Sequence, residues 1–205
     1  ALGDALTASL EVFPDGRALE VLVLGGGSGG AVSELLACFD PDCTKVVFAE
    51  PDEKRAAMAE QKFFDHHFVE YATSGLTKGP AKGVFDPQRY DLAIVLGGEA
   101  GAARTEKGSR RLLRTMKSRG LCLLEATVDP PVWARLAFGF GEETASRFLP
   151  ARAESVGALS EELGALGFDS VSVHRAPSFG RVYAAARAPE KRRLQRRDPF
   201  KLEML

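Results

Sequence analysis

Short apolar runs alternate with amphipathic stretches along most of the chain, and the two patterns predict different elements. Apolar runs bounded by glycine, proline and polar residues are typical of buried strands. They occur at residues 19–24, 45–49, 67–71, 90–96, 120–127, 171–174 and 181–186. Stretches whose apolar positions recur every three or four residues are typical of helices that pack one face on a core. They occur at residues 31–39, 52–62, 105–118 and 155–166.

The order of these elements predicts an α/β fold, a doubly wound, seven-stranded, Rossmann-like sheet with helices on both faces. Strands separated by helices join a sheet in parallel, so most of the sheet is expected to be parallel. The last two strands are separated only by a short segment that contains Pro177 and Gly180, which predicts an antiparallel hairpin at one edge. Residues 1–188 are therefore expected to form one core, and residues 189–205 a basic tail or interdomain linker.

Composition narrows the function classes. The chain has 205 residues, enough for one domain with a core, and its formal net charge is −1. This charge gives no reason to expect nucleic acid or an anionic membrane as a partner, and no apolar run approaches the roughly 18 residues of a membrane span. The three cysteines, Cys38, Cys43 and Cys122, are too few and too irregularly spaced to predict a disulfide framework or a zinc site. We therefore expect no metal site and a cytoplasmic location.

A glycine-rich loop, Gly25-Gly-Gly-Ser-Gly-Gly30, lies between the first predicted strand and the first predicted helix. It satisfies Gly-x-Gly-x-x-Gly, which is typical of dinucleotide sites, and equally Gly-x-Gly-x-Gly, which is typical of S-adenosylmethionine sites. Glycines let the backbone pass close to a ligand at the amino end of a helix. Glu50 directly follows the second predicted strand, where an acid is placed to bind ribose hydroxyls or to cap the helix that begins near Asp52. The predicted cofactor-binding residues are Gly25, Gly26, Gly27, Gly29, Glu50 and Leu96.

Several segments, taken in order, carry a family pattern. They are Leu22-Val-Leu-Gly-Gly-Gly-Ser-Gly-Gly30, Ala59-Glu-Gln-Lys-Phe63, Phe85-Asp-Pro-Gln-Arg-Tyr-Asp-Leu92, Leu112-Leu-Arg-Thr-Met-Lys-Ser-Arg-Gly120 and Leu123-Leu-Glu-Ala-Thr127. In this order and spacing they resemble the class I methyltransferases, especially the methyltransferase domains of polyketide synthases and their degenerate relatives in fatty acid synthases. The resemblance covers nearly all of residues 5–187. It implies S-adenosylmethionine as cofactor, with an acyl carrier protein and neighbouring synthase domains as partners.

The chain departs from this family at positions to which the resemblance assigns a function. Val23 stands where the family has an acid that orients the methionine part of the cofactor. The family's adenine-binding acid would fall near Ala72 or Thr73, and neither residue is an acid. Carbon-methylating members have a general-base histidine after the fourth strand, and Ala100 takes its place. Glu125 corresponds to the acid that pairs with this histidine. The family also carries a helical lid before the core, whereas about eighteen residues precede the first predicted strand.

These losses predict a domain that keeps the fold and has lost its chemistry. Removing a proton from a carbon acid near neutral pH needs a base of matched pKa within hydrogen-bond reach, and Ala100 supplies none. Each missing charged hydrogen bond also weakens cofactor binding by about 1.5–3 kcal/mol, so S-adenosylmethionine is expected to bind weakly or not at all. Our interpretation is a methyltransferase-like domain of a polyketide or fatty acid synthase module that is catalytically degenerate and structural.

Two alternatives remain open. One is an active S-adenosylmethionine-dependent methyltransferase that acts on an acyl substrate held by a carrier protein, with Glu99 or Glu125 as the catalytic base. Glu99 follows the fourth predicted strand, where the reactive end of a ligand would lie, although a solvated loop acid is the simpler interpretation. The other is an aminopropyltransferase of the polyamine-synthase kind, because the glycine loop resembles that family's loop. Ser28, however, replaces the aspartate of that loop.

Overall fold

The computed structural model describes residues 2–11, 13, 16–77, 83–128, 152–176 and 181–190. Its helices are α1 (Leu2–Leu10), α2 (Val32–Leu36), α3 (Glu53–Lys62), α4 (Gly97–Ala103), α5 (Glu106–Thr115) and α8 (Val156–Ala165). Its strands are β1 (Leu19–Leu24), β2 (Thr44–Ala49), β3 (Val69–Ala72), β4 (Tyr90–Val95), β5 (Met116–Val128), β6 (Arg152–Ala153), β7 (Asp169–Arg175) and β8 (Arg181–Arg187). Most of these elements overlap predicted ones, and β1 has the predicted bounds.

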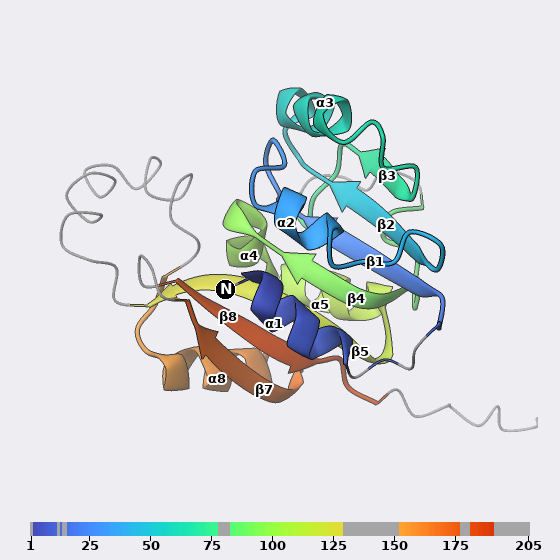
Figure 1. The fold of residues 1–205 in the computed structure, drawn as a ribbon. Coiled ribbons are helices and arrows are strands. Elements are labelled where there is room, and N and C mark those ends of the chain that lie inside the picture. Colours follow the sequence, from blue (N-terminus) through green and yellow to red (C-terminus); the bar gives the residue numbers. More distant parts are fainter. Residues whose placement is uncertain are drawn as a thin grey trace, which may run out of the picture.

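The described strands join one sheet in the order β3-β2-β1-β4-β5-β8-β7, with β6 paired to β5 outside this path. Neighbouring strands from β3 to β5 are parallel, whereas β8 lies antiparallel to both β5 and β7. This arrangement (Figure 1) confirms the predicted doubly wound sheet with its antiparallel carboxyl-terminal hairpin. The two-residue strand β6 lies outside the prediction, and with it the sheet has eight strands instead of seven.

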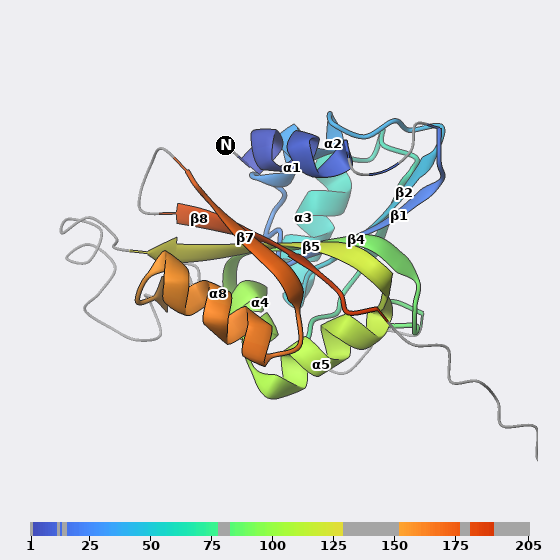
Figure 2. The ribbon, with the colours of Figure 1, turned by 90° about the horizontal axis from the view of Figure 1, so that it is seen from below.

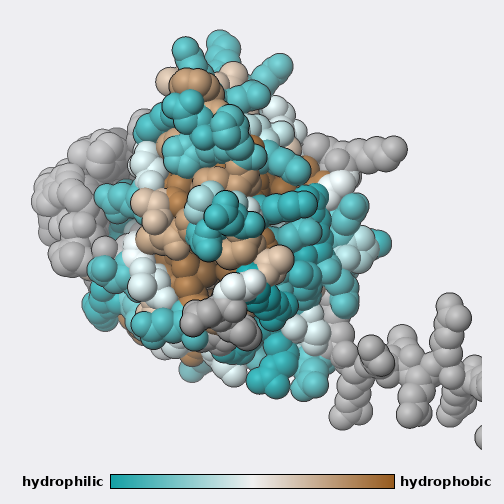
Figure 3. All heavy atoms as spheres, turned by 45° about the vertical axis from the view of Figure 1, so that its right-hand side comes forward, coloured by the Kyte–Doolittle hydropathy of each residue, from teal (hydrophilic) through white to brown (hydrophobic). Residues whose placement is uncertain are grey.

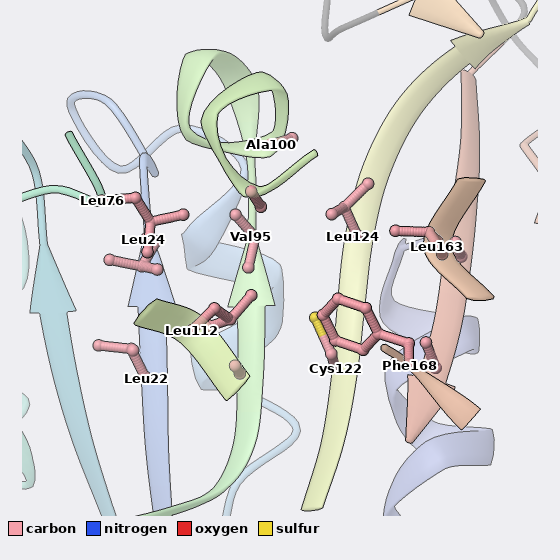
Figure 4. Close-up of a cluster of buried hydrophobic side chains, with 14 of the residues drawn as sticks. Leu22, Leu24, Leu76, Val95, Ala100, Leu112, Cys122, Leu124, Leu163 and Phe168 are labelled. Atoms are coloured by element: carbon pink, nitrogen blue, oxygen red, sulfur yellow. The ribbon is translucent and has the colours of Figure 1, made fainter. Parts of the chain in front are cut away.

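Helices cover both faces of the sheet. Helices α1, α2 and α3 lie on one face, and α4, α5 and α8 lie on the other (Figure 2). Along β1, Val21 and Val23 pack toward the first group of helices, whereas Leu22 and Leu24 pack toward the second (Figure 4). Strands buried on both faces read as continuous apolar runs, which is why the sequence predicts the central strands closely. No helix in the described ranges has the length and apolar character of a membrane span.

Two helices and the end of a third also differ from the prediction. Helix α1 lies outside every predicted element, although its Leu6 is fully buried and anchors it to the core. Helix α4 escapes prediction because its sequence, Gly-Gly-Glu-Ala-Gly-Ala-Ala, is rich in glycine, the poorest helix former after proline. The helix expected to reach residue 118 ends at Thr115, because Met116 already has extended backbone angles and begins β5.

One buried acid ties together the amino-terminal ends of the central strands. Asp91, in β4, accepts hydrogen bonds from Arg17 Nη2 at 2.7 Å, from Lys117 Nζ at 2.6 Å and from the Glu20 backbone N–H at 3.2 Å. A buried charge is tolerated when it is paired and hydrogen-bonded in this way. The network therefore anchors β1, β4 and β5 at the edge of the sheet opposite the glycine loop.

Candidate functional site

A cavity of about 310 Å³ lies at the carboxyl edge of the sheet, where doubly wound folds bind their ligands. Its wall is formed by the segments that follow β1, β2 and β4, together with β5 and the beginning of β8. The predicted residues on this wall are Gly25, Gly26, Gly27, Glu50, Leu96, Glu99 and Glu125. Arg55 and Arg181 also line it, and neither was predicted. Of the predicted site residues, only Gly29 lies away from the wall.

The glycine loop owes its composition to close packing and to backbone conformation. Gly25, Gly27 and Gly29 all have positive φ angles, of 71°, 61° and 85°, which side chains of L-residues disfavour. A Cβ on Gly25 would lie 2.4 Å from the Leu96 carbonyl oxygen. A Cβ on Gly29 would lie 2.3 Å from the ring of Phe63, so Gly29 serves the packing of the loop on α3 and not the cavity. A Cβ on Gly27 would meet open space, which leaves room for a ligand beside it.

Glu50 faces the cavity and is already engaged within the chain. Its side chain is buried, and Oε2 accepts a hydrogen bond of 2.9 Å from the Gly27 backbone N–H. Oε1 accepts a bond of 3.2 Å from the Asp52 N–H and lies 3.5 Å from Arg55 Nε. The capping role that was the alternative for Glu50 belongs to Asp52, whose side chain accepts from the Arg55 N–H at 3.0 Å. The loop and Glu50 therefore close on each other across the cavity.

Glu99 is not the solvated loop acid that the sequence predicted. It lies in the first turn of α4 and is 5% exposed, because β4 turns directly into this helix and carries the side chain under Gly25 and Gly75. Its Oε2 accepts a hydrogen bond of 2.5 Å from the Leu76 N–H. Burial raises the pKa of Glu99, and the negative charge of Glu50 raises it further. The hydrogen bond from the Leu76 N–H and the positive charge of Arg111 lower this pKa in part.

Glu125 has partners, although they are not the histidine that the resemblance implies. Its Oε2 accepts a hydrogen bond of 3.0 Å from the Gly97 N–H, and its Oε1 lies 3.6 Å from Arg181 Nε. Arg181 reaches the site because β8 runs antiparallel to β5 and places it opposite Thr127. The sequence could not predict this contact, because the sequence of either strand alone does not determine which residues of an antiparallel pair lie opposite each other.

No histidine stands on the cavity wall. Ala100, at the position matched to the family's base, lies in α4 and is fully buried in the apolar cluster that also holds Val95 and Leu124 (Figure 4), and it does not line the cavity. The three histidines of the chain all lie elsewhere: His66 and His67 precede β3, and His174 lies in β7. Within the described ranges, no three His, Cys, Asp or Glu side chains gather as metal ligands would.

The burial of Glu99 predicts a pH dependence of folding. Because its pKa is raised in the folded chain, the folded state holds the proton more tightly than the unfolded state does. The contribution of Glu99 to stability is therefore greatest at acidic pH and falls as the pH rises from its ordinary pKa to the raised one. We expect Glu99→Gln to match the wild type at the acidic end of this window and to exceed it in free energy of unfolding at neutral pH.

Urea unfolding of both chains at the two pH values measures this effect. Glu106→Gln is the matched control, because Glu106 is exposed in the first turn of the neighbouring helix α5. A wild-type chain that gains stability over Glu99→Gln as the pH rises would contradict the expectation, because it would mean that the folded chain favours the ionised carboxylate.

Solved methyltransferases share this fold. The CurJ carbon methyltransferase matches with a TM-score of 0.75 at 20% identity, over 92% of this chain and 53% of that one. The CMeT domain of the citrinin polyketide synthase matches with a TM-score of 0.74 at 16% identity, over 93% and 52%. The trans-methyltransferase CalH, solved in complex with SAH, matches with a TM-score of 0.67 at 18% identity, over 91% and 54%. The chain has the methyltransferase fold.

A sequence comparison also finds a polyketide synthase. The chain is 25% identical over 147 residues to the non-reducing polyketide synthase mapC of Penicillium roqueforti, a match that covers 69% of this chain and 6% of that synthase. No family model matches the chain. The chain spans about half the length of the solved methyltransferases and a small part of the synthase. The predicted resemblance to polyketide synthase methyltransferase domains is thereby confirmed.

Proposed function

We propose that this chain is a catalytically degenerate, structural methyltransferase-like domain of a polyketide or fatty acid synthase. The observation that carries the proposal is the state of the acids on the cavity wall. The carboxylates of Glu50, Glu99 and Glu125 each accept a hydrogen bond from a backbone N–H of the chain itself. No histidine stands beside them. A general base must reach a substrate proton. Carboxylates that already accept hydrogen bonds from the chain's own backbone are poorly placed to do so.

The residues present fit one end of S-adenosylmethionine, the proposed cofactor. Glu50 is placed to hold ribose hydroxyls, provided that it gives up its bond from the Gly27 N–H, and the loop glycines allow close backbone approach. The methionine end lacks such a partner, since Val23 is fully buried in the core under α2 and is not part of the wall. The cofactor, when bound, supplies an electrophilic methyl group on its sulfonium sulfur. Weak retention of the nucleoside end is the consequence for this chain.

The proposed partners are the neighbouring domains of the synthase and its acyl carrier protein. Support comes from the length of the polyketide synthase relative, of which the matched segment is 6%. In such an assembly a domain without chemistry contributes through its surfaces, which set the spacing and orientation of its neighbours.

A second candidate function is methyl transfer to a carrier-bound acyl substrate with Glu99 as the base. The raised pKa of Glu99 favours this candidate, because a base is most effective when its pKa lies near the ambient pH. Glu99 would first have to release the Leu76 N–H, and that segment would have to move away from α4.

Methyl transfer to a synthetic substrate separates the two functions. We expect the chain, incubated with S-adenosylmethionine and a β-ketoacyl pantetheine thioester, to form no methylated product above a protein-free control, as read by mass spectrometry. Product formation that Glu99→Gln abolishes and Glu106→Gln retains would overturn the degenerate assignment and establish the second candidate. Product formation that neither substitution affects would overturn the assignment and direct attention to Glu125.

A further inference from the structure

A second hollow of the described chain, a groove, lies at the edge of the sheet opposite the candidate site. It has a volume of about 870 Å³ and is formed by the amino-terminal ends of β1, β2 and β3, together with the end of α2 and the loop that follows it. Its apolar wall includes Leu19, Leu36, Phe39 and Phe68. Figure 3, in which the right-hand side of Figure 1 comes forward, shows apolar atoms gathered on this side within a ring of hydrophilic residues.

The rim of this groove is mostly acidic. Four carboxylates and one lysine contribute to the lining: Glu20, Asp42, Asp65, Glu70 and Lys45. Arg89 bridges two of the acids, with its Nε 2.8 Å from Glu20 and its Nη2 3.5 Å from Glu70. Asp42 and Asp65, which are exposed, remain as negative charges at the mouth of an apolar surface. Such a surface suits an occupant that combines apolar and basic side chains.

The chain leaves the sheet at this same edge. Strand β8 runs antiparallel to β5, and its last residue, Arg187, lies opposite Leu121. The Ala188 N–H then donates to the Gly120 carbonyl at 2.8 Å, beside the beginning of β4. Only β5 and β4 separate β8 from β1, which is a distance of about 15 Å at the usual strand spacing. A segment that continues from Glu190 therefore begins close to the groove.

The composition of residues 191–205 matches the groove. This segment, Lys-Arg-Arg-Leu-Gln-Arg-Arg-Asp-Pro-Phe-Lys-Leu-Glu-Met-Leu, has six basic and two acidic residues, hence a side-chain charge of +4. Its apolar residues include Leu194, Phe200 and Leu202. Fully extended, it reaches about 50 Å, more than enough to cross the groove.

We propose that residues 191–205 dock in this groove, with apolar side chains against Phe39 and Phe68 and basic ones beside Asp42 and Asp65. The tail then runs along the surface of the domain from the end of β8 to the groove. This docking surface lies away from the cavity, so the inference stands independently of the proposed function.

Cys43 lines the groove and reports on its occupant. We compare the rate at which a maleimide alkylates Cys43 in the 205-residue chain and in a chain that ends at Glu190, reading each cysteine-containing peptide by mass spectrometry. Docking predicts that Cys43 reacts at least about fivefold more slowly in the longer chain, as an effective tail concentration in the millimolar range allows. The protection is expected to shrink in high salt, because charge pairs at a surface are screened.

Charge reversal at the rim provides the matched variants. Asp42→Lys combined with Asp65→Lys is expected to bring the two rates within about twofold of each other, since like charges now face the tail. The comparison uses the ratio of rates in the long and short chains, because burial and Asp40, with a smaller contribution from Asp42, raise the pKa of the Cys43 thiol. Glu154→Lys combined with Glu161→Lys, at exposed positions near and on α8, is the control and keeps the protection.

Two outcomes overturn the proposal. Equal alkylation rates in the long and short wild-type chains would show that the tail does not occupy the groove. Protection that increases with protein concentration would assign the groove to a second copy of the chain, because an intramolecular contact is independent of concentration.

Discussion

Neither S-adenosylmethionine nor S-adenosylhomocysteine is expected to give saturable heat below about 1 mM when it is titrated into this chain. The physical reason is the loss of two charged contacts. Val23 lies in the core at the position where the resemblance implies an acid for the methionine amino group. Ala72, the last residue of β3, and Thr73 stand where it implies an acid for adenine. Each such hydrogen bond contributes about 1.5–3 kcal/mol, so their loss weakens binding by two or more orders of magnitude.

A parallel titration with adenosine tests which end of the cofactor the chain recognises. Because the wall fits only the nucleoside end of the cofactor, adenosine and S-adenosylhomocysteine are expected to bind within about threefold of each other. Glu50→Gln should weaken both, since an amide can still accept from the Gly27 N–H but lacks the charge that favours ribose hydroxyls. Glu53→Gln, in the exposed first turn of α3, is the matched control. Micromolar binding of S-adenosylhomocysteine with much weaker binding of adenosine would show that the methionine end is recognised, and the degenerate assignment would fail.

The parts of the fold that the sequence predicts are those whose pattern has a single physical cause. Strands β1 and β4 are buried on both faces over most of their length, so the apolar run gives the bounds of β1 and places the end of β4 one residue too late. Helix α3 is marked by Asp52, whose side chain caps it. Helix α4 has no such mark, because it is held by its place between β4 and α5 and not by the propensity of its glycines.

The candidate site likewise contains residues that the sequence predicts and residues that it does not. Gly25, Glu50 and Leu96 follow strands β1, β2 and β4, and the carboxyl ends of parallel strands meet at one edge, so topology alone brings them together. Arg181 joins them only through the antiparallel register of β8 with β5, which no local pattern records. The sequence places Glu99 directly after β4, as in the structure, but predicts an exposed acid, because the burial of Glu99 depends on α4 and on the distant Leu76 N–H.

Gly25→Ala is expected to lower the free energy of unfolding by about 3 kcal/mol, the largest stability change among the loop glycines. The added Cβ would lie 2.4 Å from the Leu96 carbonyl oxygen, which is backbone held in place by the bond from the Leu96 N–H to the Leu24 carbonyl. Overpacking of this kind costs about 1–3 kcal/mol. The positive φ angle of 71° at Gly25 adds about 1–2 kcal/mol for any residue with a Cβ.

Gly27→Ala separates the two contributions. Its φ angle of 61° imposes a similar backbone cost, but its Cβ would meet open space, so we expect a loss of only about 1–2 kcal/mol in urea unfolding. Equal losses in the two variants would mean that β1 and β4 can separate to admit a side chain at Gly25. The loop would then be compliant enough to open around a ligand, and the self-closed cavity would cease to be an argument against catalysis. A clearly larger loss in Gly25→Ala than in Gly27→Ala instead identifies the loop as a rigid packing element between β1 and β4, consistent with a domain retained for its structure.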